Sequence, residues 1–258
     1  MFIVSAGQRL LQVTAKHNIN TILADRLELL KDFDIVVVCA DSASMNTRLD
    51  DMKYSRWDEL RLIVEVIIEI GSIFNSSGID VYFLNRPPLL NVSDLGYIDQ
   101  AFTFEPHGYT PLVSVLRKIF NSYNDERDND KRILVLVATD GEPSNSEGDS
   151  DVATLKYVMQ QERESDRIHV TFLACTDNES NVIYLDEWDN IMTNVNVTDD
   201  YRTERDFVHR NHGSHYPFSF GDYIAKALLN AIDPKIDVFK DPETRNNISA
   251  NKDTLETS

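Results

Sequence analysis

The sequence has few cysteines and no long apolar segment. Its 258 residues contain two cysteines, Cys39 and Cys175, and no run of 18 apolar residues, about the length that a transmembrane helix needs. Residues 1–11 have neither the basic start nor the long apolar core of a secretory signal peptide. We therefore expect a cytoplasmic protein that folds in a reducing compartment.

Basic residues are also scarce. The chain has 25 Lys and Arg against 43 Asp and Glu, which gives a formal net charge of −18. A surface of this sign repels nucleic acid and anionic membranes, so we expect neither as a partner. A basic protein partner is compatible with this charge, although solubility alone is the simpler explanation. The hydrophobic content of 42% is enough for one good core in a chain of this length.

The rest of the chain is organised around residues 34–45, DIVVVCADSASM. Its apolar run, Ile35 to Cys39, is short and shows no alternation, which is typical of a strand buried on both faces. The run ends abruptly in small residues, among them Asp41, Ser42 and Ser44. Ligand sites of α/β proteins lie at such a transition from a parallel strand to a helix. This stretch is therefore the first candidate for a functional site.

Two later segments supply further candidate residues. Residues 133–139 form a second apolar run, and as a parallel strand it would bring Asp140 to the same edge of the sheet as Ser42. Between the two runs, Thr110 precedes Pro111, a pattern that begins a helix. The Thr110 hydroxyl can therefore either cap that helix or turn toward a cation.

These residues resemble the metal-ion-dependent adhesion site of the von Willebrand factor type A (VWA) domain. That family has Asp-x-Ser-x-Ser after its first strand, a Thr in a later loop and an Asp at the end of its fourth strand. Ser42 and Ser44 match the two serines, and Thr110 and Asp140 match the later residues. Ala40 stands where the family has its first aspartate. Several segments, including TDGEP and GDYIAKALL, are most similar to intracellular members from fungi, protists and large viruses.

The resemblance covers roughly residues 33–232 and implies both a fold and a type of site. The fold is α/β, with a doubly wound, mainly parallel sheet and helices on both faces. In this fold another strand separates those that end at Cys39 and Cys175, so these cysteines are about 10 Å apart and form no disulfide. The site holds Mg²⁺, which in turn binds an acidic side chain of a partner protein.

The residue types suit such a cation. Mg²⁺ prefers six hard oxygen ligands and usually keeps water on some positions. The candidate ligands are Ser42, Ser44, Thr110 and Asp140, with Asp41 as a fifth. Strand alternation directs Asp41 away from the place of the absent carboxylate. Because Ala40 removes one negative charge, we expect an impaired or vestigial metal site, and Ala40→Asp should raise its affinity for divalent ions.

We expect three parts in the chain: a helical segment at 1–32, the VWA-like domain at 33–239 and a disordered polar tail at 240–258. Within the domain, alternating patterns predict right-handed crossovers and a mainly parallel sheet. The helices are expected to begin after Ser5, Asn20, Ser55 and Thr110, at about 150 and at Ser219. The further strands are expected at 79–84, 168–174 and 193–198, with a short antiparallel edge strand within 89–104.

One other cluster could bind a metal. His209, His212 and His215 recur at intervals of three, a spacing that could offer imidazoles to zinc. Gly213 interrupts any helix that would align them, and the run contains neither cysteine nor an acidic residue. We therefore expect a surface loop at these histidines.

The leading hypothesis is a protein-interaction module that is not an enzyme. One alternative is a purely structural component of a larger assembly. The other is a Mg²⁺-dependent enzyme that processes phosphate groups with Asp41 and Asp140. Against this enzyme, the sequence has no Gly-rich phosphate loop, no Lys or Arg close to either aspartate, and no His or Cys beside a candidate nucleophile.

Overall fold

The computed structural model describes residues 5–49, 54–125, 131–176, 178–185, 188–233 and 235–236. The predicted tail at 240–258 lies outside these residues. The helices are α1 (Ala6–Lys16), α2 (Thr21–Arg26), α3 (Arg56–Phe74), α4 (Leu95–Phe102), α5 (Leu112–Asp125), α6 (Val152–Tyr157), α7 (Trp188–Ile191), α8 (Tyr201–His212) and α9 (Phe220–Asn230). The strands are β1 (Phe33–Cys39), β2 (Ile79–Phe83), β3 (Leu89–Val92), β4 (Arg132–Thr139), β5 (Ile168–Ala174) and β6 (Val195–Thr198).

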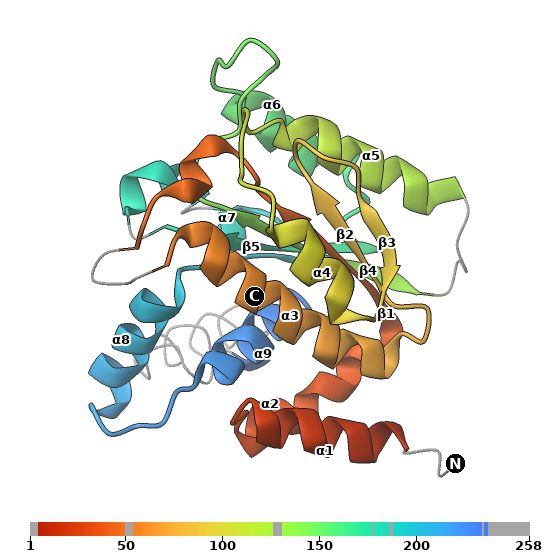
Figure 1. Ribbon diagram of the computed structural model, residues 1–258, viewed down its shortest axis with the longest axis vertical. Coiled ribbons are helices and arrows are strands. Elements are labelled where there is room, and N and C mark those ends of the chain that lie inside the picture. The colour runs from red at the N-terminus through yellow and green to blue at the C-terminus, as the bar shows by residue number, and fades with distance from the viewer. Residues whose placement is uncertain are drawn as a thin grey trace, which may run out of the picture.

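The six strands form one sheet in the order β3-β2-β1-β4-β5-β6 (Figure 1). Every pairing is parallel except that of β2 with β3, which is antiparallel at one edge. Strands β1 and β4 are neighbours over their full length, with Phe33 opposite Arg132 and Cys39 opposite Ala138. This topology confirms the predicted α/β class and the predicted adjacency of the two central strands.

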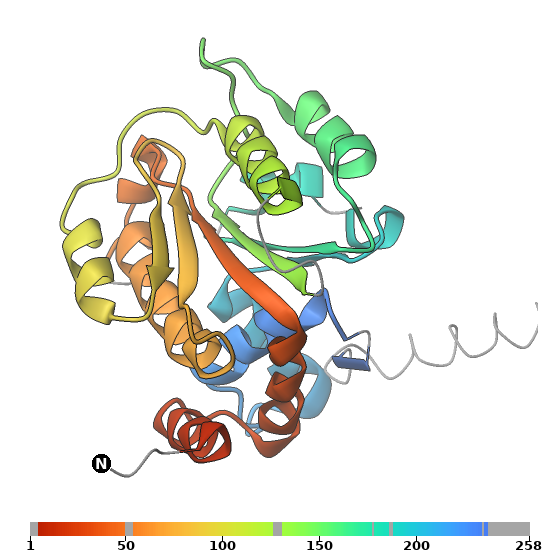
Figure 2. The same cartoon turned by 90° about the vertical axis from the view of Figure 1, so that its right-hand side faces the viewer.

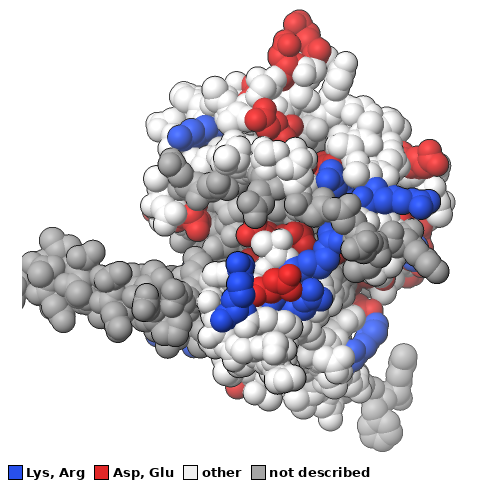
Figure 3. All heavy atoms as spheres, turned by 90° about the vertical axis from the view of Figure 1, so that its left-hand side faces the viewer, with Lys and Arg blue, Asp and Glu red and all other residues white. Residues whose placement is uncertain are grey.

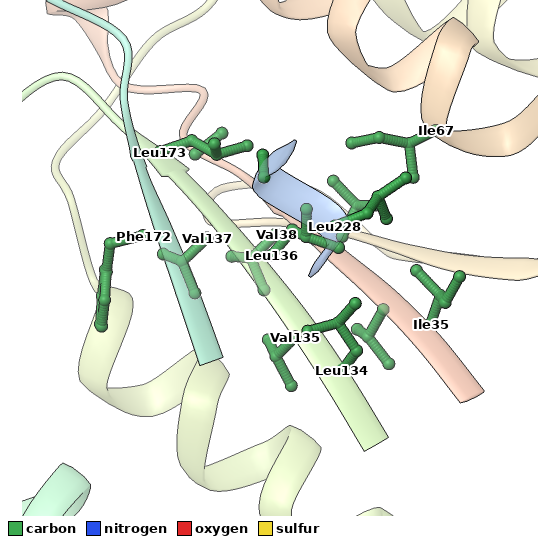
Figure 4. Packing of buried hydrophobic residues seen from close by; sticks show 14 of the residues in the cluster. Ile35, Val38, Ile67, Leu134, Val135, Leu136, Val137, Phe172, Leu173 and Leu228 are labelled. Carbon is green, nitrogen blue, oxygen red and sulfur yellow. The ribbon is translucent and has the colours of Figure 1, made fainter. Parts of the chain in front are cut away.

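Helices cover both faces of the sheet. Figure 2 shows α5 and α6 on one side, and α3, α8 and α9 on the other. The central strands are apolar at nearly every position because both of their faces are buried. In Figure 4, Ile67 of α3 and Leu228 of α9 meet strand residues such as Val38, and all three are fully buried. The hydrophobic core therefore lies on both faces of the two central strands. The loops at the carboxyl ends of these strands lie outside the core and can carry a site.

Two local predictions differ from the structure. Residues 95–102 form the helix α4, where only an edge strand was expected in that region. His209 and His212 lie in the last turn of α8, so the expectation of a surface loop is wrong for them. The helix ends at Gly213, whose φ of +97° is easily adopted only by glycine. Both cysteines are free, in agreement with the expectation of no disulfide.

The N-terminal helices pack against α3 and α9. Asp222 accepts hydrogen bonds from the backbone N and the Nδ2 of Asn20, at 2.7 and 2.8 Å. Arg9 donates to the carbonyl of Ile73 at 3.0 Å. A Cβ added at Gly221 would lie only 2.2 Å from the carbonyl oxygen of His17. The close approach of the first helices to α9 therefore requires glycine at position 221.

Charges are mixed on the face drawn in Figure 3. Lys and Arg side chains lie next to Asp and Glu side chains near its middle, so the charges on this face are not of one sign. No helix among the described residues is both long and apolar enough to cross a membrane.

A buried histidine should make stability depend on pH. The His169 ring lies edge-on to Phe33, with ring centroids 5.0 Å apart, and its Nδ1 is 2.7 Å from the carbonyl oxygen of Ala231. Burial lowers the pKa of His169, and the hydrogen bond to Ala231 opposes this only in part. The unfolded chain therefore takes up this proton first as the pH falls. The contribution of His169 to the free energy of unfolding is fully present above the ordinary histidine pKa of about 6.5. It is lost as the pH falls toward the lower pKa of the folded state.

We expect His169→Gln to flatten this dependence. Urea unfolding between about pH 7.5 and 5.5 should show a smaller loss of stability in the variant than in the parent. His107→Gln, which changes an exposed histidine, is the control and should leave the parent's slope unchanged. An equal slope in His169→Gln and the parent would contradict the assignment.

Candidate functional site

The candidate residues lie where the sheet changes direction. From the central pair, β2 and β3 follow on one side of β1, and β5 and β6 follow on the other side of β4. In open α/β sheets the connections that leave two such strands diverge, and ligands bind in the crevice between them. Residues 40–46 follow β1 and residues 140–144 follow β4, so both loops lie at the position of this crevice, and we use the word crevice for the edge between them.

Two serines and one aspartate form a continuous hydrogen-bonded chain there. The Oγ atoms of Ser42 and Ser44 are 3.1 Å apart, and Ser44 Oγ donates to Asp140 Oδ1 at 3.0 Å. Ser42 and Asp140 are buried, whereas Ser44 is exposed at the surface. Three of the residues named from the sequence thus meet at one place, and one of them, Ser44, is exposed at the surface.

Asp140 also has a cationic partner that the sequence analysis missed. Arg56 Nη1 donates to Asp140 Oδ2 at 3.0 Å, and the two residues are only 6% and 1% exposed. Arg56 is the first residue of α3, after a capping box formed by Ser55 and Asp58. Its backbone N donates to the carbonyl of Thr47 at 3.0 Å, which fixes the start of the helix beside the Ser42 loop.

Asp41 has a different set of partners. Its Oδ1 accepts hydrogen bonds from Asn85 N at 2.8 Å and from Asn85 Nδ2 at 3.1 Å. Its Oδ2 lies 2.9 Å from Arg86 Nε, in an ion pair whose angle does not make a directed hydrogen bond. Asp41 is fully buried and anchors the segment that follows β2.

Thr110 is connected to the loop after β4 through its backbone. Its N donates to Ser144 Oγ at 2.9 Å, and its carbonyl accepts from Ser144 N at 2.9 Å. Nearby, His107 N donates to the Asp41 carbonyl at 2.8 Å, and Gly108 O accepts from Ala43 N at 3.3 Å. Residues 107–110 therefore line the crevice between the two loops.

The described donors do not fit a resident Mg²⁺. Both oxygens of Asp140 are already engaged, one by Ser44 and the other by the Arg56 guanidinium. Both oxygens of Asp41 face Asn85 and Arg86. Ala40 offers no oxygen from its side chain, so the remaining free donors are hydroxyls, which lack the charge that a Mg²⁺ site requires.

Other ionisable groups at this edge are held neutral. Burial, followed by the charge of Asp41, raises the pKa of Cys39. Burial, followed by the charges of Glu142 and Asp140, raises the pKa of Tyr184, whose hydroxyl lies 3.3 Å from the Gly141 carbonyl. The Cys39 thiol and the Tyr184 phenol are therefore protonated at neutral pH and are poor nucleophiles.

The structure corrects one expectation from the sequence. The sequence analysis placed no Lys or Arg close to either aspartate, but Arg56 pairs with Asp140 and Arg86 pairs with Asp41. One signal was available for Arg56. A cation in the first turn of a helix opposes the helix dipole. An arginine directly after the Ser55 cap therefore indicates a nearby negative charge that compensates it. Arg86 and Asn85 offered no comparable signal.

The described residues contain no group of three or more His, Cys, Asp and Glu side chains arranged to hold a metal ion. This includes the histidines of α8 and the turn after it. His209 Nε2 instead lies 3.1 Å from the carbonyl oxygen of Tyr216, and the ring of His212 lies 4.8 Å from that of Tyr216. These two histidines thus help to fix the end of α8.

Comparison with known proteins gives little further guidance. No family model matches the sequence, and no curated protein matches it significantly. Among solved structures, the chain is similar to proximal thread matrix protein 1 from the mussel byssus, with 14% identity and a TM-score of 0.42. The match covers 66% of this chain and 44% of that one, so the chain spans less than half of that protein. A likeness this distant carries no information on function.

Proposed function

We propose that this protein is a protein-interaction module of the VWA kind, whose former metal site is vestigial. The observation that carries the proposal is the meeting of Ser42, Ser44 and Asp140 at the carboxyl ends of β1 and β4. The sequence pattern alone singles out these three residues, and in the structure they form one hydrogen-bonded chain. The partner binds over this crevice, where Ser44 is exposed.

An aromatic rim beside the crevice supports binding. Tyr97 and Phe104, which form this rim, are each 60% exposed. An apolar hollow of about 270 Å³ lies between them, with Phe83 and Pro87 in its wall. Exposed aromatic side chains are enriched at protein interfaces, and clustered apolar surface is typical of a binding face.

This rim is connected to the crevice by Arg86. Its guanidinium pairs with Asp41 and donates to the carbonyls of Ala101 and Phe104, at 3.0 and 3.3 Å. It also lies over the rings of Trp57 and Phe83, at 5.1 and 5.6 Å. One partly buried side chain thus contacts both Asp41 and the aromatic rim, and a single partner surface can cover both.

The state of the ionisable side chains argues against the alternative of a phosphate-processing enzyme. Each aspartate is paired with an arginine, and Cys39 and Tyr184 are held protonated. The net charge of −18 favours a protein partner that is neutral or basic at the contact.

The test uses one substitution in the crevice and one at the opposite end of the sheet. Ser44→Arg places a bulky cation at an exposed position of the site, and Gln161→Arg adds the same charge at an exposed position before β5. A partner captured by the wild-type protein is purified and titrated against all three proteins. We expect Ser44→Arg to weaken binding about tenfold or more, and Gln161→Arg to leave it unchanged.

Equal affinity for wild type and Ser44→Arg would refute binding at this crevice. Such a result would favour the alternative of a structural component that keeps the fold without using the site.

A further inference from the structure

Asp140 lies next to a cation that belongs to the chain itself. The Arg56 guanidinium is 3.0 Å from the carboxylate, and both groups are almost completely buried. Water and salt screen such a pair far less than a surface pair, so the charge of Asp140 is neutralised from within the protein. In the VWA family, a bound metal ion neutralises the charge of the corresponding aspartate.

The position of Arg56 is electrostatically unfavourable by itself. A positive side chain in the first turn of α3 opposes the helix dipole, and burying a guanidinium requires compensation by an opposite charge. Asp140 contributes such a charge at 3.0 Å. The hydrogen bond from Arg56 N to the Thr47 carbonyl holds the arginine at the end of the loop that carries Ser42 and Ser44.

A divalent cation at the serines would meet this guanidinium. Asp140 Oδ1 is the oxygen that Ser44 contacts, and Oδ2 of the same carboxylate is bound to Arg56. A metal that used this carboxylate would therefore stand within a few ångströms of a fixed positive charge. Ala40 supplies no second carboxylate to offset the repulsion.

We infer that Arg56 is a built-in cation that has replaced the divalent metal, so that the site excludes metal and binds its partner without it. Ala40 and Arg56 then act together, because the absent carboxylate and the added guanidinium both make the charge of the same site more positive. The inference rests on the proposed function only for the partner, since exclusion of metal is a property of the purified protein.

The test measures Mn²⁺ binding by calorimetry and by the paramagnetic signal of the ion. It compares wild type, Ala40→Asp, Ala40→Asp/Arg56→Gln and Ala40→Asp/Arg56→Lys. Ala40 N donates to Ala138 O at 2.9 Å, which continues the ladder of β1 with β4. An aspartate at position 40 therefore lies on the same side of the extended chain as Ser42.

The sequence alone predicted that Ala40→Asp would raise the affinity for divalent ions, but the Arg56–Asp140 pair changes this expectation. We expect no saturable Mn²⁺ binding by wild type or by Ala40→Asp, because Arg56 pairs with the new carboxylate as well. Ala40→Asp/Arg56→Gln should bind Mn²⁺ at least about tenfold more tightly than wild type and should melt at a higher temperature when the ion is present. Ala40→Asp/Arg56→Lys keeps the positive charge and should not bind.

Three results would overturn the inference. The first is Mn²⁺ binding by wild type that Asp140→Asn abolishes, since the metal would then coexist with Arg56. The second is equal binding by Ala40→Asp and Ala40→Asp/Arg56→Gln. The third is an Ala40→Asp/Arg56→Gln protein that stays unfolded with and without Mn²⁺, since the metal would not have replaced the charge.

The partner measurement separates this inference from the proposed function. If the partner binds equally in chelator and in Mg²⁺, and Ser44→Arg weakens it, both stand. If Ser44→Arg weakens a partner that binds only with Mg²⁺, the interaction module stands and the built-in cation fails.

Discussion

Replacing Arg56 by methionine is expected to lower the free energy of unfolding by about 3–5 kcal/mol, because it leaves the Asp140 carboxylate buried without its cation. The pair is 3.0 Å apart, and its members are among the least exposed charged residues of the site. Methionine keeps much of the length of the side chain, so the loss reports the charge more than the packing. Urea unfolding near neutral pH measures the difference.

Arg61→Met is the matched control. Arg61 lies on the same helix and pairs with Glu65 and Asp99, but its side chain is largely exposed, so we expect a loss of no more than about 1 kcal/mol. Adding Asp140→Asn to Arg56→Met should recover part of the stability, since no buried charge then remains. If Arg56→Met and Arg61→Met are equally mild, the Arg56–Asp140 pair is not a buried electrostatic contact of the native protein.

Replacing Asp41 by asparagine is expected to lower the free energy of unfolding by about 2–5 kcal/mol and to loosen the aromatic rim. The change removes the charge that faces Arg86. It also weakens the oxygen that accepts both hydrogen bonds from Asn85. Arg86 lies over Trp57, so release of the guanidinium should also change the fluorescence of that tryptophan. Unfolding and emission spectra measure the two effects.

This prediction separates a structural aspartate from a metal ligand. Asp99→Asn changes an exposed carboxylate of α4 and should have little effect on either measurement. If Asp41→Asn is mild in chelator and costly only when Mg²⁺ is present, Asp41 is a ligand and our assignment of it to the Asn85 and Arg86 contacts is wrong.

The fold was largely predictable because burial leaves a direct mark on composition. Residues 35–39 and 133–138 are unbroken apolar runs, a pattern that is typical of strands covered on both faces. Capping residues such as Ser55 and Ser219 marked helix starts because their side chains satisfy backbone groups a few residues away. The helix α4 was missed because its short segment follows a strand and carries a weak pattern.

The sequence by itself therefore determined the α/β sheet, its two central strands and the edge at which Ser42, Ser44 and Asp140 meet. Such features depend on periodicity and on contacts within a few residues, which a sequence displays. Only the tertiary structure decided which charges are paired. Arg56 is 84 residues from Asp140, and Asn85 is 44 residues from Asp41. Electrostatic contacts act through space, and no local pattern records which distant side chain will neutralise a buried charge.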